Sequence, residues 1–478
     1  MRPLVIFTVC TVISASAFVG VAAFGGHSGF PLDDGWIHQT YARNWAETGQ
    51  LAYVAGQPSA GSTAPLWTWL LSLAYRLQID PVVWAYTLGT LSLAVSAWLV
   101  YRLADRLYPA HRGVAWAAGL ACALEWHLVW AAASGMETTL FIALTLLVAE
   151  RTLAGSRAWL IGAIGGSLIL TRPEGLLLMG LVAAALGVRS DWRALLQFSI
   201  GFLIVLAPGA VFNLQAGGTL FPNTFFAKQS EYAILTSTVA IWLQAIAELI
   251  AAPLSGAMAA ALPGCVVWLI AQRRRLLDRK RWAKWLLIVW AGAHLGVYAL
   301  RLPVHYQHGR YLIPIIPVVV LYGVIGTAQL ANRAGRWARV IGRVLALSIA
   351  AITIGFLPIG AVAYATDVSI IDGEMVTVAR WIDAHVPANA VVAAHDIGAL
   401  GYFTRRPLLD LAGLISPEVI PFIRDETRLL QWVQAKGAQY VVTFPSWYPT
   451  LVNAANLSPV FAGRSNASPD HLTVYAVK

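Results

Sequence analysis

The sequence predicts a polytopic α-helical membrane protein that ends in a small soluble α/β domain. Three observations support this fold class. The 478 residues are 58% apolar and only 12% charged, a composition too apolar for an ordinary soluble enzyme. Apolar runs of about 20 residues, the length that crosses a bilayer as a helix, recur along most of the chain. The apolar density stops near residue 365, and shorter alternating segments follow it.

The charge balance divides the chain at the same place. Residues 1–365 carry 25 Lys/Arg against 13 Asp/Glu, whereas residues 366–478 carry 8 against 10. The basicity therefore belongs to the membrane part and requires no nucleic-acid partner. The three cysteines lie inside apolar segments and have neither metal-ligand spacing nor the pattern of a disulfide framework. We expect a transmembrane module at 1–365 and a C-terminal domain at 366–478.

Eleven apolar segments have the length and composition of membrane spans. They are residues 3–25, 82–104, 113–132, 134–150, 157–171, 174–188, 194–214, 255–272, 283–301, 311–330 and 341–364. We interpret the first as an uncleaved anchor, with a signal peptide as the alternative. The segment 66–77 is apolar but only about a dozen residues long, so we expect a helix that lies in the membrane interface.

Lys and Arg are distributed unequally between the two sets of loops. The loop 273–284 carries seven cations and the loop 333–343 carries four, and cytoplasmic loops collect such residues. Alternating the spans outward from these loops leaves 19 Lys/Arg inside and 6 outside. The predicted protein is a multi-pass protein of the plasma (inner) membrane with its N-terminus inside and its C-terminus outside. The first external loop, residues 26–81, and the C-terminal domain then lie at the outer face.

Adjacent carboxylates, Asp33 and Asp34, open a short helix in the first external loop. Apolar residues at every fourth position predict this helix over residues 35–48. Aspartate is a favoured helix cap, which is one interpretation of the pair. The other is a general base that takes a proton from an attacking hydroxyl, because neighbouring like charges and partial burial raise at least one carboxyl pKa. The residues alone leave both interpretations open.

The chain resembles a known superfamily, the C-type integral-membrane glycosyltransferases, in a series of short motifs. In chain order these are Asp33-Asp34, Tyr41-Ala42-Arg43-Asn44, Gly61–Trp67, Ser134–Thr138, Thr171–Gly175, Pro222–Lys228, Gly309–Tyr311, Asp396–Tyr402 and Asp410–Leu414. Each motif is weak alone, but their order is similar to bacterial relatives of the mycobacterial terminal arabinofuranosyltransferase. More distantly, it is similar to protein O-mannosyltransferases.

The resemblance implies transfer of a sugar, with inversion, from a polyprenyl-phosphate donor to an acceptor hydroxyl at the outer face. The acceptor would be a glycan, a lipid or a protein, and the bilayer would hold the donor. Family members place a catalytic aspartate in the first external loop, so the resemblance assigns Asp33 and Asp34 to catalysis. The resemblance favours Asp33 slightly over Asp34 as the catalytic residue.

A donor of this kind leaves as a phosphate, so the site requires cations near the departing oxygens. Among the predicted external cations, Arg172, Lys228 and Arg310 are the candidates for this role. Arg76 and Arg301 are expected as readily to extend toward lipid headgroups.

Further substrate-binding candidates at the outer face are Arg43, Glu137, Glu174, Tyr311 and His308. Structural pairing with a neighbouring cation, as between Glu174 and Arg172, is the other interpretation of the glutamates. No metal site or cofactor is predicted. A divalent ion shared by His38, His305 and His308 is an alternative that we set against ordinary loop chemistry.

Residues 366–478 alternate helix-like and strand-like stretches, which predicts a small α/β sheet without a nucleotide-binding fingerprint. Its Asp396 and Asp410 are interpreted as turn residues or as contacts to the acceptor. Two rivals to the transferase remain: a transporter or flippase of lipid-linked sugars, and a non-catalytic subunit of glycan assembly. Transporters tend to show internal repeats, and the sequence shows none.

Overall fold

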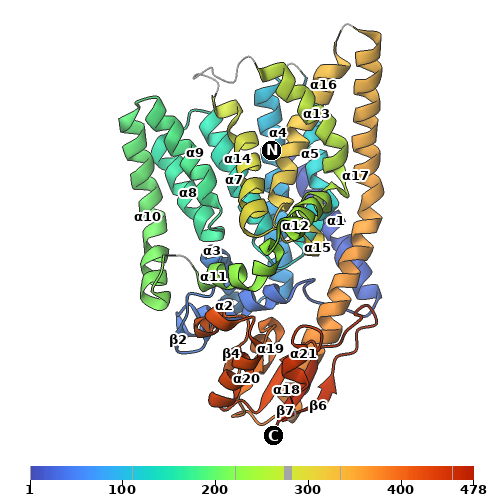
Figure 1. Cartoon of the computed structure of the whole chain (residues 1–478). Helices are drawn as coiled ribbons and strands as arrows, with labels where there is room; N and C mark the ends of the chain where they lie inside the picture. Colours follow the sequence, from blue (N-terminus) through green and yellow to red (C-terminus); the bar gives the residue numbers. More distant parts are fainter. Residues whose placement is uncertain (1, 110, 221, 274–281, 334, 455) are drawn as a thin grey trace.

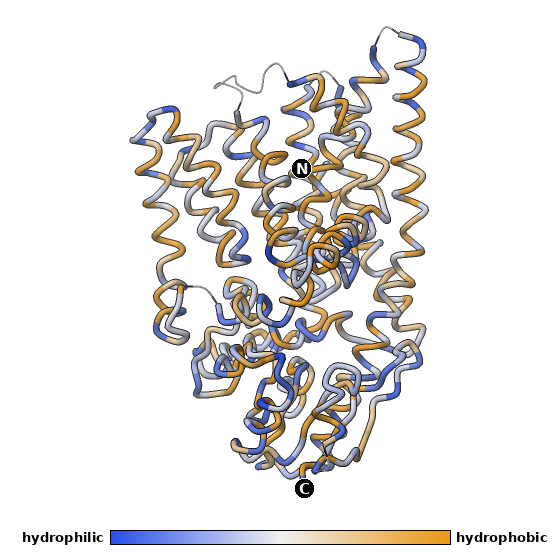
Figure 2. The backbone as a smooth tube through the Cα atoms, in the orientation of Figure 1, coloured by the Kyte–Doolittle hydropathy of each residue, from blue (hydrophilic) through white to orange (hydrophobic). Residues whose placement is uncertain are grey.

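The structure is a computed structural model that describes residues 2–109, 111–220, 222–273, 282–333, 335–454 and 456–478. A bundle of long helices forms most of the molecule, and the C-terminal domain lies at one end of it (Figure 1). The bundle is apolar along most of its length, whereas hydrophilic residues gather at its ends and in the C-terminal domain (Figure 2). This arrangement confirms the predicted class of an apolar helical module followed by a small domain with a sheet.

The helices of the module match the predicted spans. They are α1 (Arg2–Phe24), α4 (Pro81–Leu107), α5 (Arg112–Ala123), α6 (Trp126–Ala132), α7 (Thr138–Leu153), α8 (Ala158–Thr171), α9 (Gly175–Val188), α10 (Trp192–Gly217), α13 (Ala257–Gln272), α14 (Leu286–Arg301), α16 (Ile316–Ala331) and α17 (Arg336–Ile371). Among the described residues, five helices are long and apolar enough to cross a membrane, or up to seven if each bent pair is one span. Eleven spans therefore stays a prediction.

The predicted span 113–132 is broken in the middle. Helices α5 and α6 meet at an angle of 54°, and Glu125 lies at the break. Its carboxylate accepts a hydrogen bond from the backbone N–H of Leu128 at 3.1 Å and lies 2.8 Å from Nδ1 of His127. The sequence shows that Glu125 is an acid within an apolar segment, and the structure identifies the partners that satisfy it.

Close helix contacts depend on glycines. A Cβ atom on Gly264 of α13 would lie 2.1 Å from the backbone oxygen of Gly323 on α16, and one on Gly326 would lie 1.8 Å from that of Gly264. Helices approach this closely in membranes where small residues remove the side-chain barrier. Larger residues at these positions would force the two helices apart.

Residues 26–81, predicted to form the first external loop, contain α2 (Asp33–Thr48), β1 (Ala52–Val54), β2 (Gln57–Pro58) and α3 (Pro65–Leu77). Helix α2 begins two residues before the predicted start, so both aspartates belong to its first turn. It ends at Gly49, whose φ of 71° favours glycine and whose N–H donates to the carbonyl of Trp45. Helix α3 coincides with the predicted interfacial helix.

Residues 215–254 contain two more helices, α11 (Asn223–Glu231) and α12 (Val239–Ala251). With their flanking turns they form an apolar pair bent by 113°. The short α15 (Tyr306–Gly309) follows α14. Helices α2, α3 and α11 lie between the bundle and the C-terminal domain (Figure 1).

The C-terminal domain is built on a five-stranded sheet of order β4-β3-β5-β7-β6 within the described residues. Its strands are β3 (Val392–Ala394), β4 (Leu408–Asp410), β5 (Tyr440–Thr443), β6 (Leu457–Ala462) and β7 (Thr473–Val477), and its helices are α18 (Thr377–His385), α19 (Gly398–Thr404), α20 (Glu426–Ala435) and α21 (Pro449–Val452). Strands β3, β4 and β5 are parallel, whereas β6 and β7 add in antiparallel pairs.

The domain is attached firmly to the module. Helix α17 continues through a π-helical turn into α18, so the predicted boundary at residues 365 and 366 falls inside a 50-residue helix, Arg336–His385. Trp36 of α2 also packs on Tyr402 and Phe403 of α19, with ring centroids 4.8 and 5.0 Å apart. Residues 26–81 and the C-terminal domain therefore share one hydrophobic core, which positions them against each other.

The orientation of the bundle stays a prediction and can be tested by cysteine labelling. Residues 274–281 of the cationic loop lie outside the described part of the chain. Exposed positions elsewhere are therefore better labelling sites. With the three native cysteines replaced, Gln57→Cys and Lys478→Cys should react with an impermeant maleimide in intact cells, because both are exposed at the predicted outer end. Arg336→Cys should react only after the cells are permeabilised. Labelling of Arg336→Cys in intact cells would reverse the predicted topology.

Candidate active site

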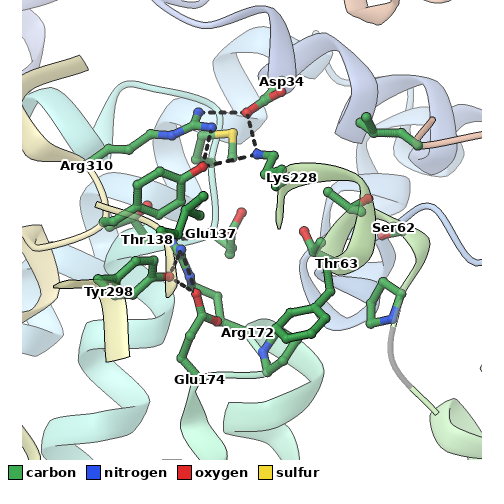
Figure 3. A pocket seen from close by; sticks show the side chains of 18 of the residues that line it. Asp34, Ser62, Thr63, Glu137, Thr138, Arg172, Glu174, Lys228, Tyr298 and Arg310 are labelled. Carbon is green, nitrogen blue, oxygen red and sulfur yellow. Dashed lines mark hydrogen bonds and ion pairs between the residues drawn. The ribbon is translucent and has the colours of Figure 1, made fainter. Parts of the chain in front are cut away.

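A cavity of about 250 Å³ lies where α2, α11, the turns before α7 and α9, and the end of α14 converge. Figure 3 shows charged side chains that point into it from separate elements. The polar and ionisable lining residues include Asp34, His38, Ser62, Thr63, Glu137, Thr138, Arg172, Glu174, Lys228, Tyr298, Arg310 and Tyr311. The structure thus brings together Asp34 and all three cations predicted for a donor phosphate.

Asp34 faces this cavity and is held by cations from two other elements. Its Oδ2 accepts a hydrogen bond from Nη1 of Arg310 at 2.7 Å and lies 3.9 Å from Nζ of Lys228 (Figure 3). Burial opposes ionisation, but the charges of Lys228 and Arg310 outweigh it and hold the pKa of Asp34 below its usual range. Asp34 is therefore a carboxylate at neutral pH.

Tyr311 links the same cations. Its hydroxyl oxygen accepts hydrogen bonds from Nη2 of Arg310 at 3.1 Å and from Nζ of Lys228 at 3.3 Å. Among the described residues, Asp34 is the carboxylate that lies within ion-pair distance of both cations.

Asp33 points away from the cavity and toward the C-terminal domain. Its Oδ2 accepts a hydrogen bond from the N–H of Gly398 at 2.6 Å and its Oδ1 accepts one from the N–H of Ala399 at 2.8 Å. Burial and the nearby Asp396 raise the pKa of Asp33 above its usual range, against the effect of these donors. Consecutive side chains of a helix point about 100° apart. The adjacent aspartates therefore face different surroundings.

A second ionic group, centred on Arg172, lines the same cavity. Nη1 of Arg172 lies 3.4 Å from Glu137, and Nη2 lies 3.0 Å from Glu174. Nε2 of His38 lies 3.2 Å from the other oxygen of Glu137. The hydroxyl of Tyr298 donates a hydrogen bond to Glu174 (Figure 3). Arg172 therefore faces two carboxylates, whereas Arg310 and Lys228 share one.

The cavity changes character toward the bundle. Leu176 and Leu177 of α9, Val297 of α14 and Leu302 line it there. Leu176 and Val297 remain 41% and 38% exposed, so the apolar wall continues onto the outside of the helices. The charged end of the cavity therefore adjoins an apolar wall formed by residues of α9 and α14.

The remaining candidates lie elsewhere. Arg43 does not line this cavity; it donates to the carbonyls of Tyr402 at 2.6 Å and Gly401 at 3.3 Å. His308 lies 2.7 Å from Asp367 on α17, outside the lining.

The alternative of a shared metal ion is not supported by the arrangement of the histidines. His38, His305 and His308 each contact a different carboxylate, those of Glu137, Glu248 and Asp367. In the described part of the chain, no group of three or more His, Cys, Asp or Glu side chains is arranged to hold a metal.

Tyr298 is a part of the site that the sequence does not indicate. It lies near the end of an apolar helix, where tyrosines are common at membrane interfaces, and nothing in the pattern singles it out.

Asp410 behaves as the turn residue that the sequence suggests, because its carboxylate accepts from the N–H groups of Ala412 and Ile415, each at 2.8 Å.

Comparison with known proteins identifies the fold. Residues 373–475 match a family described as a domain of unknown function, DUF8728, and no curated protein matches the sequence. ArnT from Cupriavidus metallidurans, solved bound to undecaprenyl phosphate, is similar over 98% of this chain and 97% of its own, with 16% identity and a TM-score of 0.58. The Archaeoglobus fulgidus oligosaccharyltransferase, solved with Zn and sulfate, matches over 98% and 73%, with 12% identity and a TM-score of 0.62.

The archaeal oligosaccharyltransferase AglB from Archaeoglobus fulgidus, solved with an inhibitory peptide and a dolichol-phosphate, has a TM-score of 0.59 at 11% identity, over 99% of this chain and 74% of its own. The predicted resemblance is therefore confirmed at the level of fold: the chain has the C-type glycosyltransferase fold over nearly its whole length.

Proposed function

We propose that this protein is an inverting glycosyltransferase that acts at the outer face of the plasma (inner) membrane. It transfers a sugar from a polyprenyl-phosphate donor to a hydroxyl of a cell-envelope glycan, lipid or protein. The observation that carries the proposal is the cavity itself, in which Asp34, the two cations that share it and an apolar wall adjoin. Two proteins of the same fold were solved with undecaprenyl phosphate and with a dolichol-phosphate, which supports a lipid-phosphate donor.

The donor phosphate binds to Lys228 and Arg310, and its polyprenyl chain leaves along Leu176 and Val297. A lysine and an arginine that together face a single carboxylate have charge available for a phosphate. Arg172, whose charge Glu137 and Glu174 already balance, is better suited to orient those carboxylates toward sugar hydroxyls.

Asp34 is the proposed general base. The acceptor oxygen forms a bond to the anomeric carbon, the bond from that carbon to the phosphate oxygen breaks, and polyprenyl phosphate leaves with the electron pair. The hydroxyl proton passes to Asp34. A carboxylate bonded to Arg310 is a weak base, so basicity should rise when the phosphate takes over these cations. Asp33, which the sequence alignment favours slightly, is assigned to holding the C-terminal domain on α2.

The experiment is a transfer assay with purified protein in nanodiscs and a panel of labelled polyprenyl-phosphate sugars. Comparing envelope glycans from cells with and without the protein by mass spectrometry would narrow the panel. We expect labelled product from one donor and at least about a hundredfold less from the Asp33→Asn, Asp34→Asn double variant. Transfer by this variant at the wild-type rate would refute the assignment.

A liposome assay separates the transferase from the transporter. Movement of the lipid-linked sugar across the bilayer, without product in the presence of acceptors, would favour the flippase interpretation. Binding of the donor with neither reaction would favour a non-catalytic subunit.

A further inference from the structure

A second cavity, of about 190 Å³, lies at the far end of α2. It is formed by the C-terminal part of α2, the strand β1 and the helix α19 with the residues that follow it. Arg43, Arg405 and Arg406 line it, together with Glu47. Arg43 belongs to a motif that the sequence singles out and that the candidate active site does not use.

The guanidinium groups of Arg43 and Arg406 are buried without a carboxylate. The residues are only 5% and 6% exposed. Their Nη groups donate to backbone carbonyls alone: Arg43 to those of Tyr402 and Gly401, and Arg406 to those at positions 382, 386 and 387. Among the described residues, neither Nε has a hydrogen-bond partner. The two buried guanidinium groups that line this cavity are therefore not fully satisfied by the protein's own hydrogen bonds in the described part of the chain.

Fewer carboxylates than arginines line this cavity: Glu47 stands against Arg43, Arg405 and Arg406. Glu47 lies 3.5 Å from Arg405, and both side chains of that pair are exposed to solvent, by 46% and 63%. The exposed Asp383 acts on Arg406 electrostatically but forms no ion pair with it among the described contacts. A buried charge without a counter-charge is costly to fold, so an anion in the cavity would offset that cost.

We propose that this cavity binds the anionic group of a ligand, a carboxylate or a phosphate, carried by a saccharide or by a lipid headgroup. Guanidinium groups bind both oxyanions through paired N–H donors. The volume suits a headgroup or a single acidic sugar. Arg43 is nine positions along α2 from Asp34, a rise of about 14 Å, so this site is separate from the proposed transfer site and does not depend on its activity.

The test measures anion binding in the full chain. In nanodiscs of zwitterionic lipid, the apparent melting temperature is measured at increasing concentrations of inorganic phosphate or of glucuronate, at constant ionic strength. The background is Arg310→Ala, which removes a cation of the active-site cavity. In a third arm, nanodiscs contain phosphatidylglycerol. We expect a saturable rise in melting temperature, and an apparent Kd weakened at least about tenfold by Arg405→Gln.

Arg428→Gln is the matched control. Arg428 lies in the same domain, is exposed to a similar degree as Arg405, and pairs with Asp425 at 3.3 Å as Arg405 pairs with Glu47. Arg43→Gln is a secondary variant, because it also removes contacts to α19. Its anion binding is interpreted only if its melting temperature without anion is close to that of the Arg310→Ala protein.

The arms distinguish the sources. Stabilisation by glucuronate assigns the site to an acidic saccharide, and stabilisation by phosphatidylglycerol without an effect of glucuronate assigns it to a lipid headgroup. Absence of a saturable effect in every arm, or an equal loss in Arg428→Gln and Arg405→Gln, would overturn the proposal.

Discussion

Asp34→Asn is expected to reduce sugar transfer by about 10²–10⁴-fold and, at the same time, to tighten donor binding. The loss follows because asparagine cannot accept the proton of the acceptor hydroxyl. The tighter binding follows because Oδ2 of Asp34 occupies Arg310, at 2.7 Å, and approaches Lys228, at 3.9 Å. A donor phosphate must displace this carboxylate, and a neutral amide competes less. We expect a donor Kd about tenfold lower, equivalent to ~1.4 kcal/mol.

This combination separates a base from a purely structural carboxylate. Loss of a structural ion pair would disorder the cations and weaken the donor. The measurements are single-turnover transfer and equilibrium binding of labelled donor to protein in nanodiscs. Weaker donor binding by Asp34→Asn would contradict the proposed competition, and unchanged transfer would contradict the proposed base.

Asp33→Asn is the matched control, because it makes the same chemical change at the adjacent position. Its carboxylate accepts from Gly398 and Ala399 of the C-terminal domain, and an amide oxygen can replace only one of the two carboxylate oxygens. We expect a lower melting temperature and a milder loss of transfer, with donor affinity unchanged. If instead Asp33→Asn abolishes transfer and Asp34→Asn does not, the roles are exchanged, as the alignment of the acidic pair suggested.

The sequence predicts the helices well because their signal is repeated. Apolar runs near bilayer length, bounded by charged loops, define most helices of the module. The period-four pattern after Asp34 likewise defines α2 and its end at Gly49. These features depend on the composition of neighbouring residues, which a sequence displays directly.

The roles of individual site residues depend on contacts between segments far apart in the chain, which no local pattern displays. Asp33 and Asp34 look equivalent in sequence, yet one contacts residues 398 and 399 and the other contacts Arg310. Arg172 looks like a third phosphate cation, but Glu137 and Glu174 both lie against it.

Arg43 follows the acidic pair on the same helix and lies in a different cavity. Such distinctions require the positions of α11, α14 and the C-terminal domain around α2, and those positions are set by tertiary packing.

Arg310→Ala and Lys228→Ala are expected to weaken donor use and to leave acceptor use nearly unchanged. Each variant removes a charge-assisted contact to the donor phosphate, worth about 1.5–3 kcal/mol. At about 1.4 kcal/mol per factor of ten, the apparent donor KM should rise about 10- to 150-fold. Arg310→Lys should recover part of the loss, because it keeps the charge but not the paired N–H donors.

The control is Arg76→Ala, which removes an exposed cation at the end of α3 that is not among the residues lining the cavity. It should leave both KM values as in the wild type. The double variant Arg310→Ala, Asp34→Asn tests the proposed competition between the carboxylate and the phosphate for Arg310. If they compete, Asp34→Asn should increase donor affinity less when Arg310 is absent than when it is present. Lys228, at 3.9 Å from Asp34, would then account for what remains. Equal gains in both backgrounds, or an unchanged donor KM in both single variants of folded protein, would place the donor phosphate elsewhere.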